Sequence, residues 1–213
     1  MDTPSRLVML ESSADEVLDA DPEWLKWART VQKCRMCART PIGYYPTPLE
    51  AVVVMRQRAS LSSARPVIEV MKRALFDRLL PEIPGMVPGP VRRRVNGKEI
   101  PDSVTVHFPP EPMVPLRGGP GSRDRRAYGI CTQCGRWKSS GAVFNDPWNV
   151  LRLQLPPTRV VVANEAAILM PEQVAEELRL LQDFPDLALR PILVVDEPFE
   201  VVPELGDVPM PGA

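Results

Sequence analysis

The sequence predicts an α+β fold of mixed α/β character, and three observations predict it. Short runs rich in β-branched residues, such as residues 51–54 (AVVV) and 159–163 (RVVVA), are typical of buried strands. Segments with apolar residues at helical spacing follow both runs. A C-x-x-C motif precedes each of these strand–helix segments. We therefore expect two loosely repeated strand–helix–strand halves, joined by a four-cysteine, zinc-ribbon-like site.

The N-terminal part predicts one strand and two helical segments. Residues 6–10 (RLVML) form a short apolar run typical of a strand. Residues 13–18 begin with the spacing of a capping box, which indicates a helical turn. Asp21 as N-cap and Pro22 in the first turn then start an amphipathic helix that leads to the first C-x-x-C motif.

The middle of the chain predicts a strand, a helix and a hairpin. Residues 49–55 (LEAVVVM) have the composition of a buried strand, and Pro66 opens a helical pattern that runs to residue 80. Asn96-Gly97 predicts a type I′ turn. This turn joins an apolar segment over 86–95 to an alternating strand over 103–108.

Composition and periodicity predict the segments after residue 108. Residues 109–127 are rich in proline, glycine and charge, which predicts an exposed, mobile loop. The later segments are predicted as strands over 150–155 and 159–163, a helix over 171–182, a strand over 187–195 and an extended tail over 198–213.

The two halves of the chain resemble each other in the order of their predicted elements. Residues 34–108 and 128–195 each begin with a C-x-x-C motif and continue as strand, proline-started helix and strand. We expect these halves to form a single domain over residues 1–213, with each half donating two ligands to one metal ion. Strand–helix–strand units also recur without common origin, so coincidence is the alternative.

The four cysteines of the chain are Cys34, Cys37, Cys131 and Cys134. Two C-x-x-C turns supply four thiolates, the tetrahedral set that Zn²⁺ prefers, and leave no open coordination position. The sequence therefore predicts one structural Zn²⁺ held by all four residues. A redox C-x-x-C is the alternative, but it needs a cysteine at a helix N-terminus, whereas Cys34 follows a predicted helix.

Composition and charge exclude several classes. A hydrophobic fraction of 44% and a charged fraction of 25% are those of a globular protein, and a net charge of −1 implies no polyanionic or membrane partner. Without an apolar stretch of about 18 residues or a signal-peptide core, we expect a cytoplasmic protein with reduced thiols.

The charge is unevenly distributed along the sequence: residues 51–140 carry +9 and residues 141–213 carry −8. These oppositely charged parts either attract each other within the fold or form separate binding faces, and the sequence does not decide between the two.

Catalysis is the class that the sequence favours least. His107 is the single histidine, and in an alternating strand we assign it to packing or surface rather than to a ligand or catalytic role. No phosphate-binding loop, dinucleotide fingerprint or zinc-protease motif occurs. We therefore expect a protein that is not an enzyme.

A basic segment over residues 92–126 carries the main alternative function. Arg92, Arg93, Arg94 and Lys98 surround the predicted hairpin turn, and three further arginines (Arg123, Arg125 and Arg126) precede the second C-x-x-C motif. Zinc ribbons with basic hairpins contact nucleic-acid phosphates, so a nucleic-acid-associated or regulatory role is the alternative. A solvated surface is the simpler interpretation.

The paired motifs, the CGRW sequence at 134–137 and the segment PTRVVVANEAAIL at 157–169 resemble a myxobacterial family named for a double CxxCG motif. Some of its members are described as immunity proteins of polymorphic or swarm-inhibition toxins. The resemblance covers about residues 34–195, and it departs at Ala38, where the first motif would have glycine. It implies a non-catalytic protein that binds and neutralises a cognate toxin. The acidic part of the chain, from Glu172 to Asp207, is then a candidate cover for a basic toxin surface.

Overall fold

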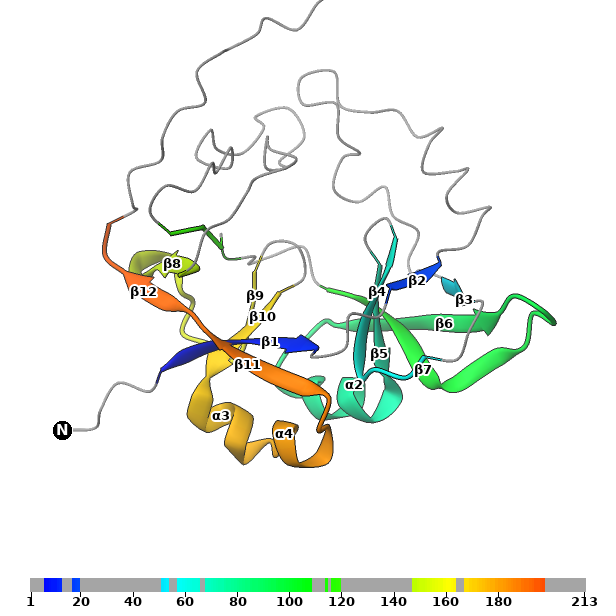
Figure 1. The fold of residues 1–213 in the computed structure, drawn as a ribbon. Coiled ribbons are helices and arrows are strands. Elements are labelled where there is room, and N and C mark those ends of the chain that lie inside the picture. The colour runs from blue at the N-terminus through cyan, green and yellow to red at the C-terminus, as the bar shows by residue number, and fades with distance from the viewer. Residues whose placement is uncertain are drawn as a thin grey trace, which may run out of the picture.

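The computed structural model describes residues 6–12, 17–19, 51–53, 57–65, 68–108, 114, 116–119, 147–163 and 167–197. In these residues three β-sheets and a few short helices form the fold (Figure 1). The predicted α+β class is therefore confirmed.

The first sheet has four antiparallel strands in the order β11-β1-β10-β9. They are β1 (Leu7–Ser12), β9 (Val161–Val162), β10 (Ile168–Pro171) and β11 (Leu187–Pro191). Val8 and Leu10 of β1 pack into the larger hydrophobic core, and Met9 packs into a smaller core on the opposite face. Because both faces of β1 are covered over residues 7–10, these residues form a continuous apolar run. The predicted strand over 6–10 is confirmed.

The second sheet has six strands in the order β2-β4-β5-β7-β6-β3, of which the central four are antiparallel. They are β2 (Val17–Asp19), β3 (Ala51–Val53), β4 (Leu61–Arg65), β5 (Ile68–Lys72), β6 (Val87–Arg93) and β7 (Glu99–His107). The edge strands β2 and β3 lie next to each other, so the sheet curls towards a barrel. The strand predicted over 49–55 and the hairpin over 86–108 are confirmed in outline.

A third, two-stranded sheet pairs β12 (Leu193–Val195) with β8 (Asn149–Leu151) in parallel. The strand predicted over 187–195 is therefore divided: β11 belongs to the first sheet and β12 to the third. The division falls at Ile192, whose N–H donates to the Leu7 carbonyl at 2.9 Å. The strand predicted over 150–155 ends at Leu151, where a 3₁₀ turn (Arg152–Gln154) begins.

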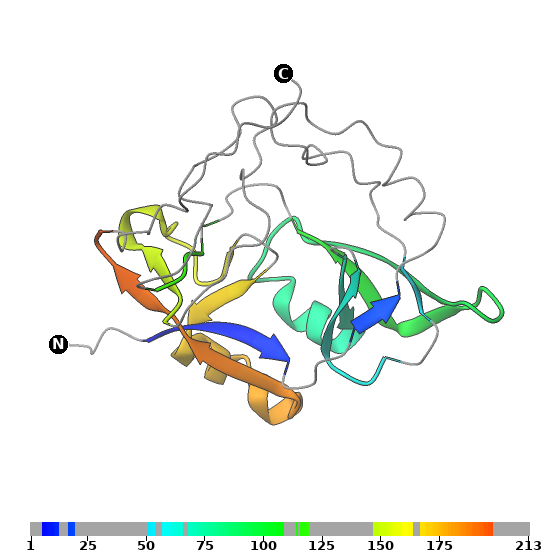
Figure 2. The ribbon, with the colours of Figure 1, turned by 45° about the horizontal axis from the view of Figure 1, so that its top comes forward.

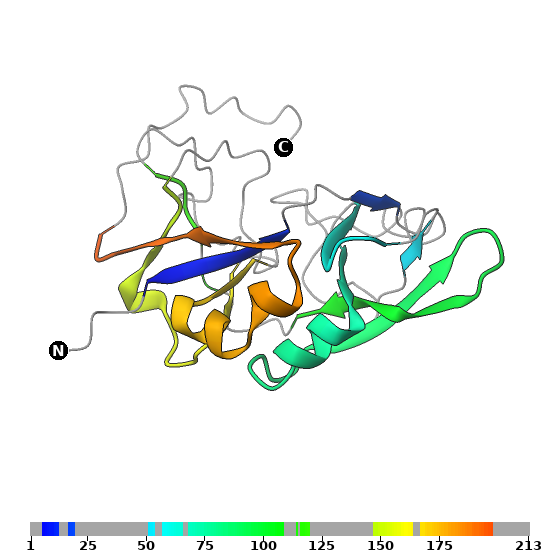
Figure 3. The ribbon, with the colours of Figure 1, turned by 60° about the horizontal axis from the view of Figure 1, so that its bottom comes forward.

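The α-helices of the described residues share one core. Figures 1 and 3 show α2 (Arg73–Leu79), α3 (Glu172–Glu177) and α4 (Leu180–Asp183) on the same side of the sheets. Leu75 and Phe76 of α2, Val174 of α3 and Leu180 of α4 all belong to the larger core cluster, together with Met71 of β5. Burial of this cluster joins the first two sheets.

The helix predicted from Pro66 is wrong over its first part. Residues 68–72 form β5, and the helix begins only at Arg73. Val70 and Met71 fit a helical face by spacing, but in the strand they point to opposite faces and both are fully buried. Pairing with β4 on one side and β7 on the other satisfies the backbone of this segment and overrides the helical pattern.

Two further predicted elements differ in detail. The helix over 171–182 is broken at Arg179, which has φ +53° and separates α3 from α4. The turn at Asn96-Gly97 is wider than type I′, because the Gly97 N–H donates to the Arg93 carbonyl and only Gly97 of the pair has a positive φ, +64°. Glycine accepts that conformation without strain.

The predictions at 13–18 and 109–127 are each corrected in part. Val17 and Leu18 lie in β2, which pairs with β4, and not in a helical turn. Val114 and Leu116 are 1% exposed, so the prediction of an exposed loop fails at these residues. Their alternate apolar side chains complete the smaller core. The helix predicted from Asp21 and the tail over 198–213 lie outside the described residues.

The first two sheets share a connection pattern. In one, β5, α2 and β6 follow in sequence, and β7 lies between the two parallel strands and is antiparallel to both. In the other, β10, the α3–α4 segment and β11 follow in sequence, and β1 lies between them in the same way. The predicted repeat of residues 34–108 and 128–195 stays a prediction, since much of both ranges lies outside the described residues.

Polar contacts also join α2 and the residues before β4 to α4 and the segment between α4 and β11. The N–H and Oγ of Ser60 each donate to the Asp186 carboxylate at 2.6 Å. Arg78 of α2 forms a 3.0 Å ion pair with Asp183 of α4, donates to the Leu178 carbonyl and stacks 6.0 Å from the Phe184 ring centre. The Arg78–Asp183 pair therefore joins the basic part of the sequence to the acidic part within the fold.

Candidate functional site

The four predicted zinc ligands, Cys34, Cys37, Cys131 and Cys134, lie outside the described residues. Within the described ranges, no group of three or more His, Cys, Asp or Glu side chains is placed to hold a metal ion. The zinc site therefore stays a prediction that rests on the donor set, four thiolates in two C-x-x-C motifs. The structure does describe the points at which both cysteine-bearing segments join the fold.

The first cysteine-bearing segment begins and ends at neighbouring strands. The described chain leaves the second sheet after Asp19, the last residue of β2, and re-enters it at Ala51, the first residue of β3. β2 and β3, the described strands on either side of residues 20–50 in the sequence, contact each other.

The second cysteine-bearing segment begins and ends at one hydrogen-bonded pair. Arg117 and Asn149 exchange backbone N–H···O bonds of 2.8 Å in both directions. The Asn149 side chain is fully buried, and its Nδ2 donates to the Gly118 carbonyl at 2.8 Å and the Arg117 carbonyl at 3.3 Å. These four bonds join Arg117 and Gly118 to Asn149, and nothing in the sequence around Asn149 predicted them.

Replacement of Asn149 by alanine is expected to destabilise the protein by about 1–3 kcal/mol, because the Gly118 carbonyl loses the Asn149 side-chain donor and the Arg117 carbonyl keeps only the backbone N–H of residue 149. Denaturant unfolding measures this change. Asn96→Ala is the matched control, since Asn96 is exposed at the hairpin tip, where its Oδ1 accepts from the Lys98 N–H. Equal losses in the two variants would contradict a special role for the Asn149 bonds.

His107 is the last residue of β7, opposite the exposed Val87 of β6. The side chain is partly buried, and no described Cys, Asp or Glu side chains gather with it into a metal-binding group. The prediction that it serves neither as ligand nor as catalyst has no test in this geometry.

The basic hairpin projects from the second sheet, as Figures 1 and 2 show at the tip of β6 and β7. Arg93, Arg94 and Lys98 are exposed, and Val95 between them is 90% exposed. Arg92 Nη1 donates to the Gly97 carbonyl at 3.4 Å. Arg123, Arg125 and Arg126, the other part of the predicted basic surface, lie outside the described residues.

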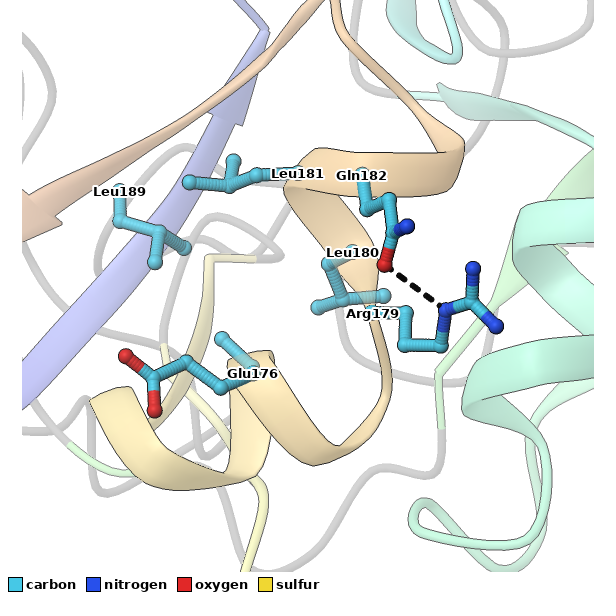
Figure 4. A pocket seen from close by; sticks show the side chains of 7 residues that line it. Glu176, Arg179, Leu180, Leu181, Gln182 and Leu189 are labelled. Atoms are coloured by element: carbon cyan, nitrogen blue, oxygen red, sulfur yellow. Dashed lines mark hydrogen bonds between the residues drawn. The ribbon is translucent and has the colours of Figure 1, made fainter.

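A second exposed surface lies over α3, α4 and β11, and we name it the α3–α4 face. It carries a hollow of about 260 Å³, whose lining includes Glu176, Arg179, Leu181 and Leu189 (Figure 4). Leu181 is 46% exposed. The acidic segment that the sequence singled out therefore contributes an apolar, concave surface as well as charge.

Glu69 is the titratable group with the most unusual environment among the described residues. It lies in β5 between Ser63 of β4 and Val106 of β7, and burial raises its pKa from 4.5 to about 7. Burial acts in this direction because the ionised carboxylate loses hydration. The sequence carried no signal for it, since its burial follows from the strand assignment that the helical prediction missed.

Comparison with known proteins leaves the family open. The chain matches no protein-family model, and no curated protein has detectable sequence similarity to it. Among the described helices, none is both long and apolar enough to span a membrane.

Proposed function

We propose that this protein is a non-catalytic, cytoplasmic binding protein that neutralises a cognate toxin, as the resemblance to the double-CxxCG family implies. One structural Zn²⁺ held by Cys34, Cys37, Cys131 and Cys134 is part of the proposal. The observation that carries it is the α3–α4 face, which is exposed, concave, partly apolar and acidic. Protein interfaces combine such apolar contacts with a polar rim.

The ion pairs of this face reduce the number of acidic residues in the C-terminal part that are candidates for contact with the toxin. Several acidic side chains of the C-terminal part are already paired within the fold: Asp183 with Arg78 and Arg179, Glu177 with Arg159, and Asp186 with Ser60. Glu176 is exposed and forms no ion pair with the described residues. The proposed contact surface is therefore smaller than the whole segment from Glu172 to Asp207.

The zinc ion has a structural part in this proposal. A four-thiolate shell leaves no open position for substrate, so the metal stabilises the two cysteine-bearing segments rather than performing chemistry. Those segments join the fold at β2 and β3 and at the Arg117–Asn149 pair. In this proposal the partner binds to the protein surface and not to the metal.

The protein encoded by the gene adjacent to this one is the natural probe, in a form made inactive by mutation. Isothermal titration calorimetry with the full chain is expected to detect a one-to-one complex. The affinity should weaken when the α3–α4 face is changed by the paired substitution Glu176→Gln and Leu181→Ala. Absence of binding to the adjacent gene product, for a protein that is folded and metal-loaded, would contradict the proposal.

The hairpin tip favours a second function, the nucleic-acid-associated role. Three exposed cations around a projecting turn suit contacts to phosphates, whose affinity falls steeply with salt. In the same calorimetric series, a DNA duplex replaces the protein probe. Salt-dependent binding to DNA that is lost in an Arg93→Gln, Arg94→Gln variant, together with no binding to the adjacent gene product, would favour this function.

A further inference from the structure

The hollow of the α3–α4 face has apolar side chains and a carboxylate on one side. In Figure 4, Leu181 of α4 and Leu189 of β11 point towards each other, and the Glu176 carboxylate lies on the same side of the hollow. Leu180, by contrast, is fully buried and forms part of the core beneath. The hollow therefore has aliphatic walls and a carboxylate at its rim.

The Glu176 carboxylate is available for a partner. Its neighbour Glu177 is occupied, since it pairs with Arg159 and also accepts from Gln173 Nε2 at 3.1 Å. Glu176 forms no ion pair with any described residue. An exposed carboxylate beside an apolar hollow is a favourable site for a cation that carries its own aliphatic chain.

Arg179, which also lines this hollow, points away from Glu176. Arg179 Nε donates to Gln182 Oε1 at 2.9 Å, and Arg179 Nη2 lies 3.6 Å from Asp183 Oδ1. Figure 4 shows the Arg179 guanidinium and the Glu176 carboxylate at opposite ends of the group. Arg179 is also the only non-glycine residue of the described chain with a positive φ, and this backbone break separates α3 from α4. Among the described residues, none therefore neutralises Glu176.

We propose that this hollow receives an arginine side chain of the protein partner, with its aliphatic stem against Leu181 and Leu189 and its guanidinium on the Glu176 carboxylate. The proposal deepens the proposed function and rests on it for the identity of the partner. Arginine fits better than lysine because its planar guanidinium pairs with a carboxylate through two parallel hydrogen bonds. Arginine is also enriched among the residues that dominate protein interfaces.

Methyl NMR tests the hollow directly, with N-acetyl-arginine amide as the probe and the full, metal-loaded chain. Titration is expected to shift the methyl signals of Leu181 and Leu189. The neutral isostere N-acetyl-citrulline amide should shift them less at the same concentration. Glu176→Gln should weaken the response to the arginine probe by up to about fivefold, the upper end of what an exposed ion pair contributes. Glu197→Gln is the matched control, because Glu197 is exposed and does not line the hollow.

The outcomes separate this proposal from the proposed function. Equal responses to both probes, no response, or an unchanged response in Glu176→Gln would each overturn the arginine site. If the adjacent gene product binds Glu176→Gln as tightly as the unchanged chain, the toxin-neutralising function stands and the arginine site fails. A stronger response to the arginine probe than to the citrulline probe, and a weaker one in Glu176→Gln, supports the site even where the adjacent gene product does not bind.

Discussion

Removal of zinc is expected to abolish the cooperative unfolding transition of this protein or to lower its melting temperature strongly. Structural zinc contributes an apparent free energy of about 10–16 kcal/mol in small peptides, which rivals the 5–15 kcal/mol stability typical of a whole domain. The cysteine pairs enclose 93 residues, whose closure costs only about 4 kcal/mol in chain entropy. The expected net effect is therefore large.

Calorimetry of chelated protein, with metal content verified by mass spectrometry, measures the effect. A Cys34→Ser, Cys131→Ser variant should reproduce it without chelator, and re-addition of Zn²⁺ should rescue only the unchanged chain. Zinc-edge absorption provides the coordination control, with four sulfur ligands expected at about 2.3 Å. An unchanged melting curve after complete zinc removal would show that the metal does not organise the fold.

Replacement of Glu69 by glutamine is expected to stabilise the protein above neutral pH. The pKa of Glu69 is about 7 in the folded chain and 4.5 as its ordinary value. Between these values the unfolded chain has lost the proton that the folded chain keeps, so stability falls as pH rises from about 4.5 to 7 and is level above that range. The total cost of ionisation is on the order of 3 kcal/mol, from 1.36 kcal/mol per pKa unit.

Denaturant unfolding between pH 4 and 9 tests this dependence. Glu69→Gln should remove the part of the slope that lies between pH 4.5 and 7, and should exceed the unchanged chain in stability at pH 8. Glu99→Gln is the control, because Glu99 is exposed at the start of β7. A pH profile that is the same for the unchanged chain and Glu69→Gln would exclude the raised pKa of the partly buried Glu69.

Local signals predicted the elements whose sequence and environment agree. The run over residues 6–10 became β1, since both its faces are buried, and the segments around Asn96-Gly97 became the β6–β7 hairpin. The helical spacing from Pro66 failed because strand pairing on both sides of Val70 was invisible in a single sequence. Likewise, Val114 and Leu116 looked like loop residues because prolines and glycines surround them, but long-range packing buries them.

The candidate sites divide in the same way. The cysteine motifs are predictable because their spacing alone carries the ligand chemistry, yet they lie outside the described residues. Acidic composition pointed to the C-terminal part but could not distinguish Asp183, which Arg78 neutralises, from Glu176, which forms no ion pair with the described residues. That distinction depends on residues about one hundred positions apart in the sequence. The hollow beside Arg179 also depends on a backbone break that helical periodicity does not predict.

Neutralisation of the toxin in living cells is the decisive test of the proposed function. The active product of the adjacent gene is expressed from an inducible promoter, with this chain, with its Cys34→Ser, Cys131→Ser variant, or alone, and survival is counted. We expect cells to survive when the toxin is expressed with the unchanged chain, and to die when it is expressed alone or with the cysteine variant. Death with the unchanged chain at matched expression, from a toxin that kills on its own, would contradict the proposed function.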